Sequence, residues 1–173
     1  MEIRQLEKKI YAGKKFTARY KTNGYYDICS YDSGFELRYV PFETPVERSF
    51  DDELLGEWLE APVAFGAFEG GELIGFAEGS PESWNNRFRL SNICVFDNAK
   101  RGSGIGTLLM DTMQKEAEKL AARMIILETQ SCNVNAIAFY KKYGFDIIGF
   151  DLYAYSNNDR ERHEIRIDMG KRL

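Results

Sequence analysis

The segment that most constrains this chain is a glycine-rich turn, Arg101-Gly102-Ser103-Gly104-Ile105-Gly106. It follows an apolar run at residues 93–96 and opens an amphipathic segment at residues 107–122. Glycines let the backbone turn with positive φ and approach a ligand closely. The N–H groups at the start of the following helix then favour an anion. With the fixed charge of Arg101, the sequence predicts a pyrophosphate-binding turn between a strand and a helix.

Two other phosphate-binding turns fit this segment less well. A P-loop requires Gly-Lys-Ser/Thr after the glycines, and the chain has none there. A dinucleotide fingerprint requires G-x-G-x-x-G, but its third glycine would fall on Thr107 or Leu109. Glu128 does lie about where a ribose-binding acid would stand. A glycine-rich helix entry without a ligand is the remaining alternative.

The segment after the amphipathic helix adds a second strand and helix. Residues 125–129 form a short β-branched run that predicts a buried strand. Asn133 is a suitable N-cap for a helix over residues 134–143, and Gly144 is a suitable residue after its end. A strand–helix–strand–helix unit is therefore expected here.

Together these motifs resemble the GNAT superfamily of N-acetyltransferases. The resemblance rests on Arg-x-x-Gly-x-Gly at residues 101–106, on Asn133, and on the pairs Phe139-Tyr140 and Gly144-Phe145. Within that superfamily the chain is similar to the streptothricin (nourseothricin) acetyltransferases. The residues that carry this closer likeness are Leu127-Glu128-Thr129-Gln130, Gly149-Phe150-Asp151 and Ser83-Trp84-Asn85. The likeness covers about residues 35–169.

The resemblance implies acetyl-CoA as the cofactor and assigns its contacts. The turn would hold the pyrophosphate, a bulged central strand would bind pantetheine through its backbone, and Tyr140 would protonate the departing thiolate. The implied cofactor-binding residues are Ile93, Cys94, Val95, Arg101, Gly102, Ser103, Gly104, Ile105, Gly106, Thr107, Asn133, Asn135, Ala136, Phe139 and Tyr140.

The acceptor amine also needs a base and an acidic environment, since an aliphatic ammonium has a pKa near ~10.4. Glu78 is the first candidate for the base and Glu128 the second. The residues expected to bind the acceptor are Trp84, Glu128, Asp151 and Glu164. Residues 43–60 hold seven Asp or Glu against one Arg. Such a run either concentrates a cationic substrate or is an ordinary solvated surface.

The expected fold class is α/β (α+β): a mixed, mostly antiparallel sheet flanked by helices, as in GNAT proteins. Strands are expected over residues 34–40, 63–68, 73–79, 87–96, 125–129, 148–155 and 164–169, with helices over residues 51–59, 107–122 and 134–143. Residues 1–30 are ambiguous. Residues 1–173 are expected to form a single domain, with the cofactor-binding part at about residues 90–145.

Composition excludes several other classes. The single histidine, His163, cannot furnish a multi-histidine metal site, so no metal is expected. The net charge of −4 argues against a nucleic-acid enzyme, and no apolar run suits a membrane helix or a signal segment. A cytoplasmic location is therefore expected, with a small-molecule amine as the partner, no nucleic acid, no membrane, and a homodimer left open.

The sequence thus favours an acetyl-CoA-dependent N-acetyltransferase that acts on a primary amine of a small cationic acceptor, with a streptothricin-type antibiotic first in line. A peptide or protein N-acetyltransferase and a non-catalytic acyl-CoA-binding module are the alternatives.

Overall fold

The computed structural model describes residues 1–96 and 102–173. Contacts divide the chain into two compact units. Unit 1 comprises residues 1–18, 50–127 and 171–173, and unit 2 comprises residues 19–49 and 128–170. Each is described by itself. The expectation of a single domain over residues 1–173 stays a prediction.

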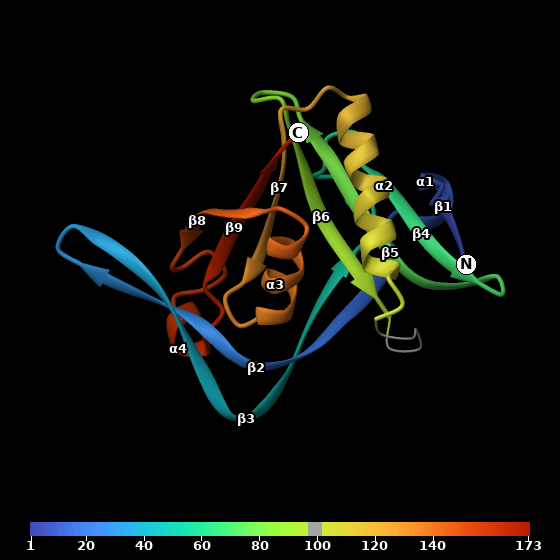
Figure 1. The fold of residues 1–173 in the computed structure, drawn as a ribbon. Coiled ribbons are helices and arrows are strands. Elements are labelled where there is room, and N and C mark those ends of the chain that lie inside the picture. The colour runs from blue at the N-terminus through green and yellow to red at the C-terminus, as the bar shows by residue number, and fades with distance from the viewer. Residues whose placement is uncertain (97–101) are drawn as a thin grey trace. The chain divides into compact units, whose positions relative to one another are not determined.

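The elements follow one another along the chain as Figure 1 labels them. The strands are β1 (Glu2–Gln5), β2 (Lys15–Tyr31), β3 (Gly34–Glu53), β4 (Val63–Glu69), β5 (Glu72–Glu82), β6 (Arg87–Val95), β7 (Met124–Gln130), β8 (Asp146–Asp151) and β9 (Arg166–Arg172). The helices are α1 (Lys8–Tyr11), α2 (Ile105–Lys119), α3 (Val134–Lys142) and α4 (Asp159–Arg162).

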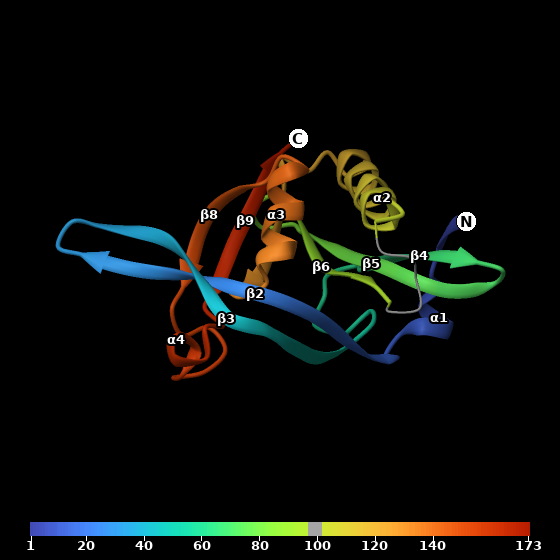
Figure 2. The same cartoon turned by 60° about the horizontal axis from the view of Figure 1, so that its bottom comes forward.

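Unit 1 is built on a sheet with the strand order β1-β4-β5-β6-β7. The β1–β4, β4–β5 and β5–β6 pairs are antiparallel, whereas β6 and β7 are parallel. Helix α2 packs on one face of β4, β5 and β6 (Figures 1 and 2) and buries Leu109, Met110, Met113 and Ala117. The other face carries a cluster of Leu6, Leu54, Leu55, Ala64 and Phe76. Both faces of this sheet are therefore covered.

Unit 2 contains the end of β7, the strand pair β8–β9, and helices α3 and α4. Strands β8 and β9 are antiparallel, and β9 lies between β7 and β8 in the strand order. The long strands β2 and β3 form a separate two-stranded sheet, most of which belongs to unit 2. Its ends at residues 15–18 and 50–53 belong to unit 1.

The predicted fold class is confirmed: the sheet is mixed and mostly antiparallel, with helices flanking it. The prediction of a helix over residues 51–59 is wrong. Residues 51–53 end strand β3, and turns follow them. The strand expected over residues 148–155 ends at Asp151.

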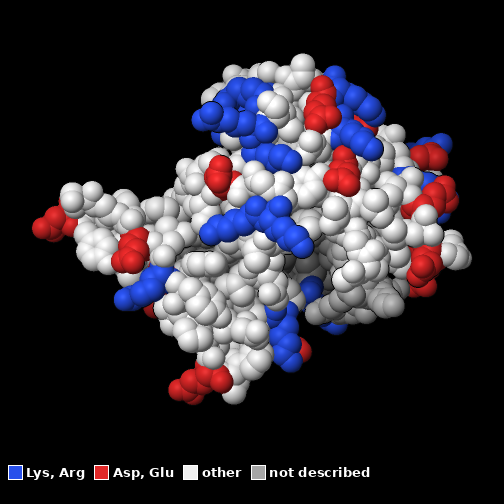
Figure 3. Space-filling model, viewed as in Figure 1, with Lys and Arg blue, Asp and Glu red and all other residues white. Residues whose placement is uncertain are grey.

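Acidic and basic side chains are interspersed on the face that Figure 3 shows. No helix among the described residues has the length and apolar character needed to cross a membrane. Within the same described ranges, no group of three or more His, Cys, Asp or Glu side chains could hold a metal ion.

Candidate active site

The central strand β6 has a bulge at Ser91. Opposite β5, Glu78 pairs with Asn92 but Gly79 pairs with Leu90, so Ser91 has no partner residue in the ladder. A Cβ added at Gly79 would lie 2.7 Å from the carbonyl oxygen of Arg89. Glycine therefore permits the close approach of the two strands beside the bulge. A bulge of this kind bends a strand and redirects its side chains.

The pairing of β6 with β7 stops short of this bulge. Its register joins Arg87, Phe88 and Arg89 to residues 124–126, and no later pair is recorded among the described residues. The recorded pairs therefore end before the part of β6 that follows the bulge. The predicted pantetheine contacts, Ile93, Cys94 and Val95, lie there and are half-buried. An extended chain with amide groups could pair with this edge as a strand would.

The glycine-rich turn has the backbone conformation that a phosphate site requires. Gly102 and Gly104 have φ of 78° and 83°. Gly104 is the N-cap residue of α2, and no side chain of the described residues caps the helix there. A helix start without a side-chain cap is a common place for an anion to bind. Arg101 lies outside the described residues.

These features fit acetyl-CoA. A helix start behind positive-φ glycines suits its pyrophosphate, and a bulged strand whose recorded pairing with β7 ends at Arg89 suits its pantetheine arm. Ser103, Gly106 and Thr107 flank the same turn, and Ile105 is buried at the first position of α2.

Glu78 on β5 is the buried carboxylate of this region. Its side chain is 1% exposed. One carboxylate oxygen accepts a short hydrogen bond from the Leu55 backbone N–H, and the other accepts one from Asn92 Nδ2 at 3.4 Å. Burial raises the pKa of Glu78, the bonds from Leu55 and Asn92 oppose the rise, and the charge of Asp52 adds to it. A carboxyl with a raised pKa is suited to accept a proton near neutral pH.

Two residues beside Glu78 were missed by reasoning from the sequence. Asn92 Nδ2 also donates to Asp52 Oδ2 at 3.0 Å, so Asn92 bonds both carboxylates. Asp52 is the second-last residue of β3, in the segment that was expected to be a helix. A correct strand boundary there, together with the β5–β6 register, is the signal that would have placed Asp52 near Glu78.

In unit 2, helix α3 carries the predicted general acid. Asn133 caps the helix, since its side chain accepts from the Ala136 N–H at 3.4 Å. Asn135 Nδ2 donates to the carbonyl of Lys21 at 3.0 Å. Tyr140 is buried and packs edge-on against Phe139. Burial raises the pKa of Tyr140 above its ordinary value, so its hydroxyl stays protonated at neutral pH.

The acids of unit 2 that were predicted to bind the acceptor each have an arginine partner. Arg166 lies 3.8 Å from both Glu128 and Asp151, and 3.3 Å from Asp168. Glu164 is 9% exposed and pairs with Arg162 at 3.0 Å. Glu128 and Asp151 therefore share the Arg166 guanidinium, whereas Glu164 pairs with Arg162.

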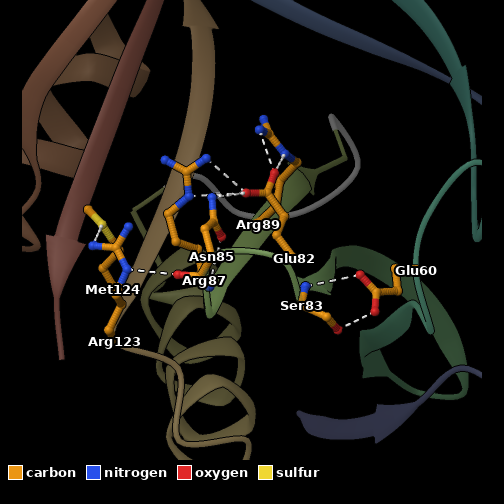
Figure 4. A network of polar contacts seen from close by, with 8 residues as sticks. All are labelled: Glu60, Glu82, Ser83, Asn85, Arg87, Arg89, Arg123 and Met124. Atoms are coloured by element: carbon orange, nitrogen blue, oxygen red, sulfur yellow. Dashed lines mark hydrogen bonds and ion pairs between the residues drawn. The ribbon is translucent and has the colours of Figure 1, made fainter.

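Trp84 stands on the turn between β5 and β6 and is 82% exposed. A polar network fixes this turn (Figure 4). Glu82 bonds both Arg87 and Arg89, Glu60 accepts from the Ser83 N–H at 3.0 Å, and Arg123 Nε donates to the Asn85 carbonyl at 2.8 Å. Trp84 and the glycine-rich turn therefore lie at opposite ends of β6: Trp84 comes before its first residue and the turn comes after its last.

Comparison with known proteins agrees with this geometry. The model of the acetyltransferase (GNAT) family matches residues 31–145. A streptothricin acetyltransferase of Streptomyces lavendulae is 29% identical, over 87% of this chain and 84% of the relative.

Two solved structures resemble the whole chain. The crystal structure of nourseothricin acetyltransferase has a TM-score of 0.81 and 26% identity, covering 99% of this chain and 97% of its own. A Bacillus anthracis str. Ames protein provisionally assigned as a streptothricin acetyltransferase, in complex with acetyl coenzyme A, has a TM-score of 0.76 and 24% identity over the same shares. The second likeness, at this identity, concerns the fold.

These matches confirm the predicted resemblance to GNAT proteins and to their streptothricin acetyltransferase group, and the match to the acetyltransferase family supports acetyl-CoA as the cofactor. With a matching family model, a bulged central strand and a helix start behind the glycines, this chain belongs to the GNAT family of acetyltransferases.

Proposed function

We propose that this protein transfers the acetyl group of acetyl-CoA to a primary amine of a streptothricin-type antibiotic. The observation that carries the proposal is the likeness to nourseothricin acetyltransferase over 99% of this chain and 97% of that one. Acetylation would remove one positive charge from the antibiotic, and the protein would thereby confer resistance. A cytoplasmic location and the oligomeric state stay predictions.

The turn at residues 101–107 binds the pyrophosphate in this proposal, and the backbone of Ile93, Cys94 and Val95 binds the pantetheine arm. One N–H of this edge faces the thioester carbonyl. A preorganised donor of this kind can contribute ~3 kcal/mol where negative charge develops on an oxygen. Asn133, Asn135, Ala136 and Phe139 complete the cofactor contacts from α3.

Glu78 is the proposed base, because it is buried, held by two donors and has a raised pKa. It takes one proton from the acceptor ammonium, and the amine nitrogen then attacks the acetyl carbon. As the C–S bond breaks, Tyr140 gives its proton to the departing sulfur and regains one from the attacking nitrogen, which loses this second proton to become the amide. The burial of Tyr140 keeps its hydroxyl protonated until then.

The other amines of the acceptor would bind carboxylates of unit 2. Glu128 and Asp151 are the stronger candidates, because each lies 3.8 Å from Arg166 and its side chain is more exposed than that of Glu164. Glu164 is less available, since it is nearly buried and paired at 3.0 Å. Trp84 is exposed and would contact an acceptor through its ring.

A thiol-release assay with acetyl-CoA tests the proposal across streptothricin, an aminoglycoside, a polyamine and a set of peptides. Streptothricin should give the highest kcat/KM. Turnover with a peptide amine, together with none on streptothricin, would replace the proposal with a peptide N-acetyltransferase. Binding of acetyl-CoA without turnover on any amine would leave a non-catalytic module.

A further inference from the structure

Asn92 occupies a position between two carboxylates of unit 1. Its single amide nitrogen donates to Asp52 Oδ2 at 3.0 Å and to Glu78 Oε1 at 3.4 Å. An asparagine NH₂ group has two hydrogens, so one is available to each carboxylate. The second oxygen of Glu78 is held by the Leu55 N–H, and the second oxygen of Asp52 by the Glu53 N–H at 2.8 Å. All four oxygens of the pair thus have a donor.

The surroundings of Glu78 contain one other charge. Its ladder partners are Ala64 on β4 and Asn92 on β6, and Leu55 approaches with its backbone. Helix α2 packs on the opposite face of β5, where Gly75 lies near Ile105. Among the described residues, Asp52 is the charged group that acts on Glu78. Because Asp52 is half-buried, its charge is only partly screened by solvent.

We propose that Asp52 and Asn92 are positioning residues for the base: Asp52 fixes the orientation of the Asn92 amide, and Asn92 holds Glu78 Oε1 in place beside the bulge at Ser91. This inference rests on the proposed function of Glu78 as the base. An amide without Asp52 could turn its oxygen toward Glu78, which would place an acceptor against a carboxylate. With Asp52 present, that orientation is unfavourable, because the Asn92 amide oxygen would then face the Glu78 and Asp52 carboxylates instead of donating to them.

Asp52 also influences the proton on Glu78. When Glu78 takes a proton from the acceptor ammonium, the N–H bond breaks and an O–H bond forms on Glu78, beside the Asp52 carboxylate. A neighbouring negative charge favours the protonated form of a carboxyl. Asp52 therefore strengthens Glu78 as a base, whereas the hydrogen bond from Asn92 weakens it and fixes its direction.

Three variants separate these effects. Asp52→Asn removes the charge but keeps an oxygen that can accept from Asn92. Asp51→Asn is the matched control, because it removes the same charge one residue away, where Asp51 accepts from the Thr17 hydroxyl instead. Asn92→Leu removes the shared donor and keeps the branched shape and the number of heavy atoms of the side chain.

Two readouts follow Glu78 in each variant. The first is the acid limb of the pH profile of kcat/KM with streptothricin. The second is the titration of the Glu78 carboxyl by ¹³C NMR, assigned with Glu78→Gln, which requires no acceptor. We expect both midpoints to move to lower pH in Asp52→Asn, to stay in Asp51→Asn, and to move to higher pH in Asn92→Leu.

Equal midpoints in Asp52→Asn and Asp51→Asn would overturn the inference, and this pair decides it even if Asn92→Leu does not fold. Failure of the proposed function looks different. The wild-type protein would then show no turnover of streptothricin, while the NMR midpoints would still respond to Asp52→Asn.

Discussion

Replacing Gly104 with alanine separates the backbone requirement of the turn from its role in binding. Gly104 has φ +83°, and a Cβ built there meets nothing within 4 Å. The cost to folding therefore comes from the left-handed conformation, at about 1–2 kcal/mol for a residue with a Cβ. For a chain of this length, that lowers Tm by roughly 2–8 °C.

Gly70 provides the matched control. It has φ +58°, a Cβ there also meets nothing within 4 Å, and it lies in the turn between β4 and β5. Gly70→Ala should lose a similar unfolding free energy without touching the cofactor. Gly104→Ala should in addition disturb the N–H groups that face the pyrophosphate. Loss of one charge-assisted hydrogen bond is worth about 1.5–3 kcal/mol, which corresponds to a roughly 10- to 150-fold rise in Kd.

Titration calorimetry with acetyl-CoA and thermal unfolding of both variants provide the measurements. The expected result is a similar loss of Tm in both variants but weaker acetyl-CoA binding in Gly104→Ala alone. Unchanged acetyl-CoA affinity in a folded Gly104→Ala protein would refute the assignment of this turn to the pyrophosphate.

Three further predictions concern the chemistry and the acceptor. Tyr140→Phe should lower kcat by ~10²–10⁴-fold with little change in the Kd of acetyl-CoA, and an unchanged kcat where chemistry limits the rate would make Tyr140 a packing residue. In the wild type, kcat/KM should rise with pH through the pKa of Glu78, which burial raises, and Glu78→Gln should lower kcat/KM and lose that limb; a limb that persists would point to another base. Because charges at exposed sites are screened over ~8 Å at physiological salt, KM for streptothricin should rise moderately with ionic strength; a KM independent of salt would count against an electrostatic role for the acidic run at residues 43–60.

Stability gives an independent check on Glu78. Because the pKa of Glu78 is higher in the folded protein than in the unfolded chain, its contribution to the free energy of unfolding depends on pH. This contribution is fully present below the unfolded pKa, near ~4.3, and is lost as pH rises through the folded pKa. Glu78→Gln should therefore raise Tm relative to the wild type at neutral pH, and this gain should vanish in acid. Thermal unfolding of both proteins between acid and neutral pH measures the difference between their Tm values. A difference that does not change with pH would mean that burial does not raise the pKa of Glu78.

Local signals in the sequence sufficed for the cofactor half of the fold. The turn at residues 69–72 predicted the β4–β5 hairpin, and Asn133 and Gly144 marked the ends of α3, whereas α2 begins at Ile105, two residues before the predicted start, and ends at Lys119 instead of residue 122. These signals work because capping and positive φ depend on a few neighbouring residues.

The long strands β2 and β3 could not be predicted in the same way. A two-stranded sheet lacks the strict alternation of apolar and polar residues that a covered sheet imposes, and Pro41 and Pro45 weaken the strand signal of β3. The acidic run at residues 51–53 was therefore assigned to a helix. The contact of Asp52 with Asn92 joins residues that are 40 positions apart in the sequence. It depends on strand register and on long-range packing, neither of which local sequence encodes.

Mass spectrometry of streptothricin after incubation with the protein and acetyl-CoA tests the central claim most directly. We expect a product with one added acetyl group on a primary amine and one free thiol released for each product molecule. Unmodified streptothricin, recovered from a protein that binds acetyl-CoA and acetylates a peptide amine, would contradict it.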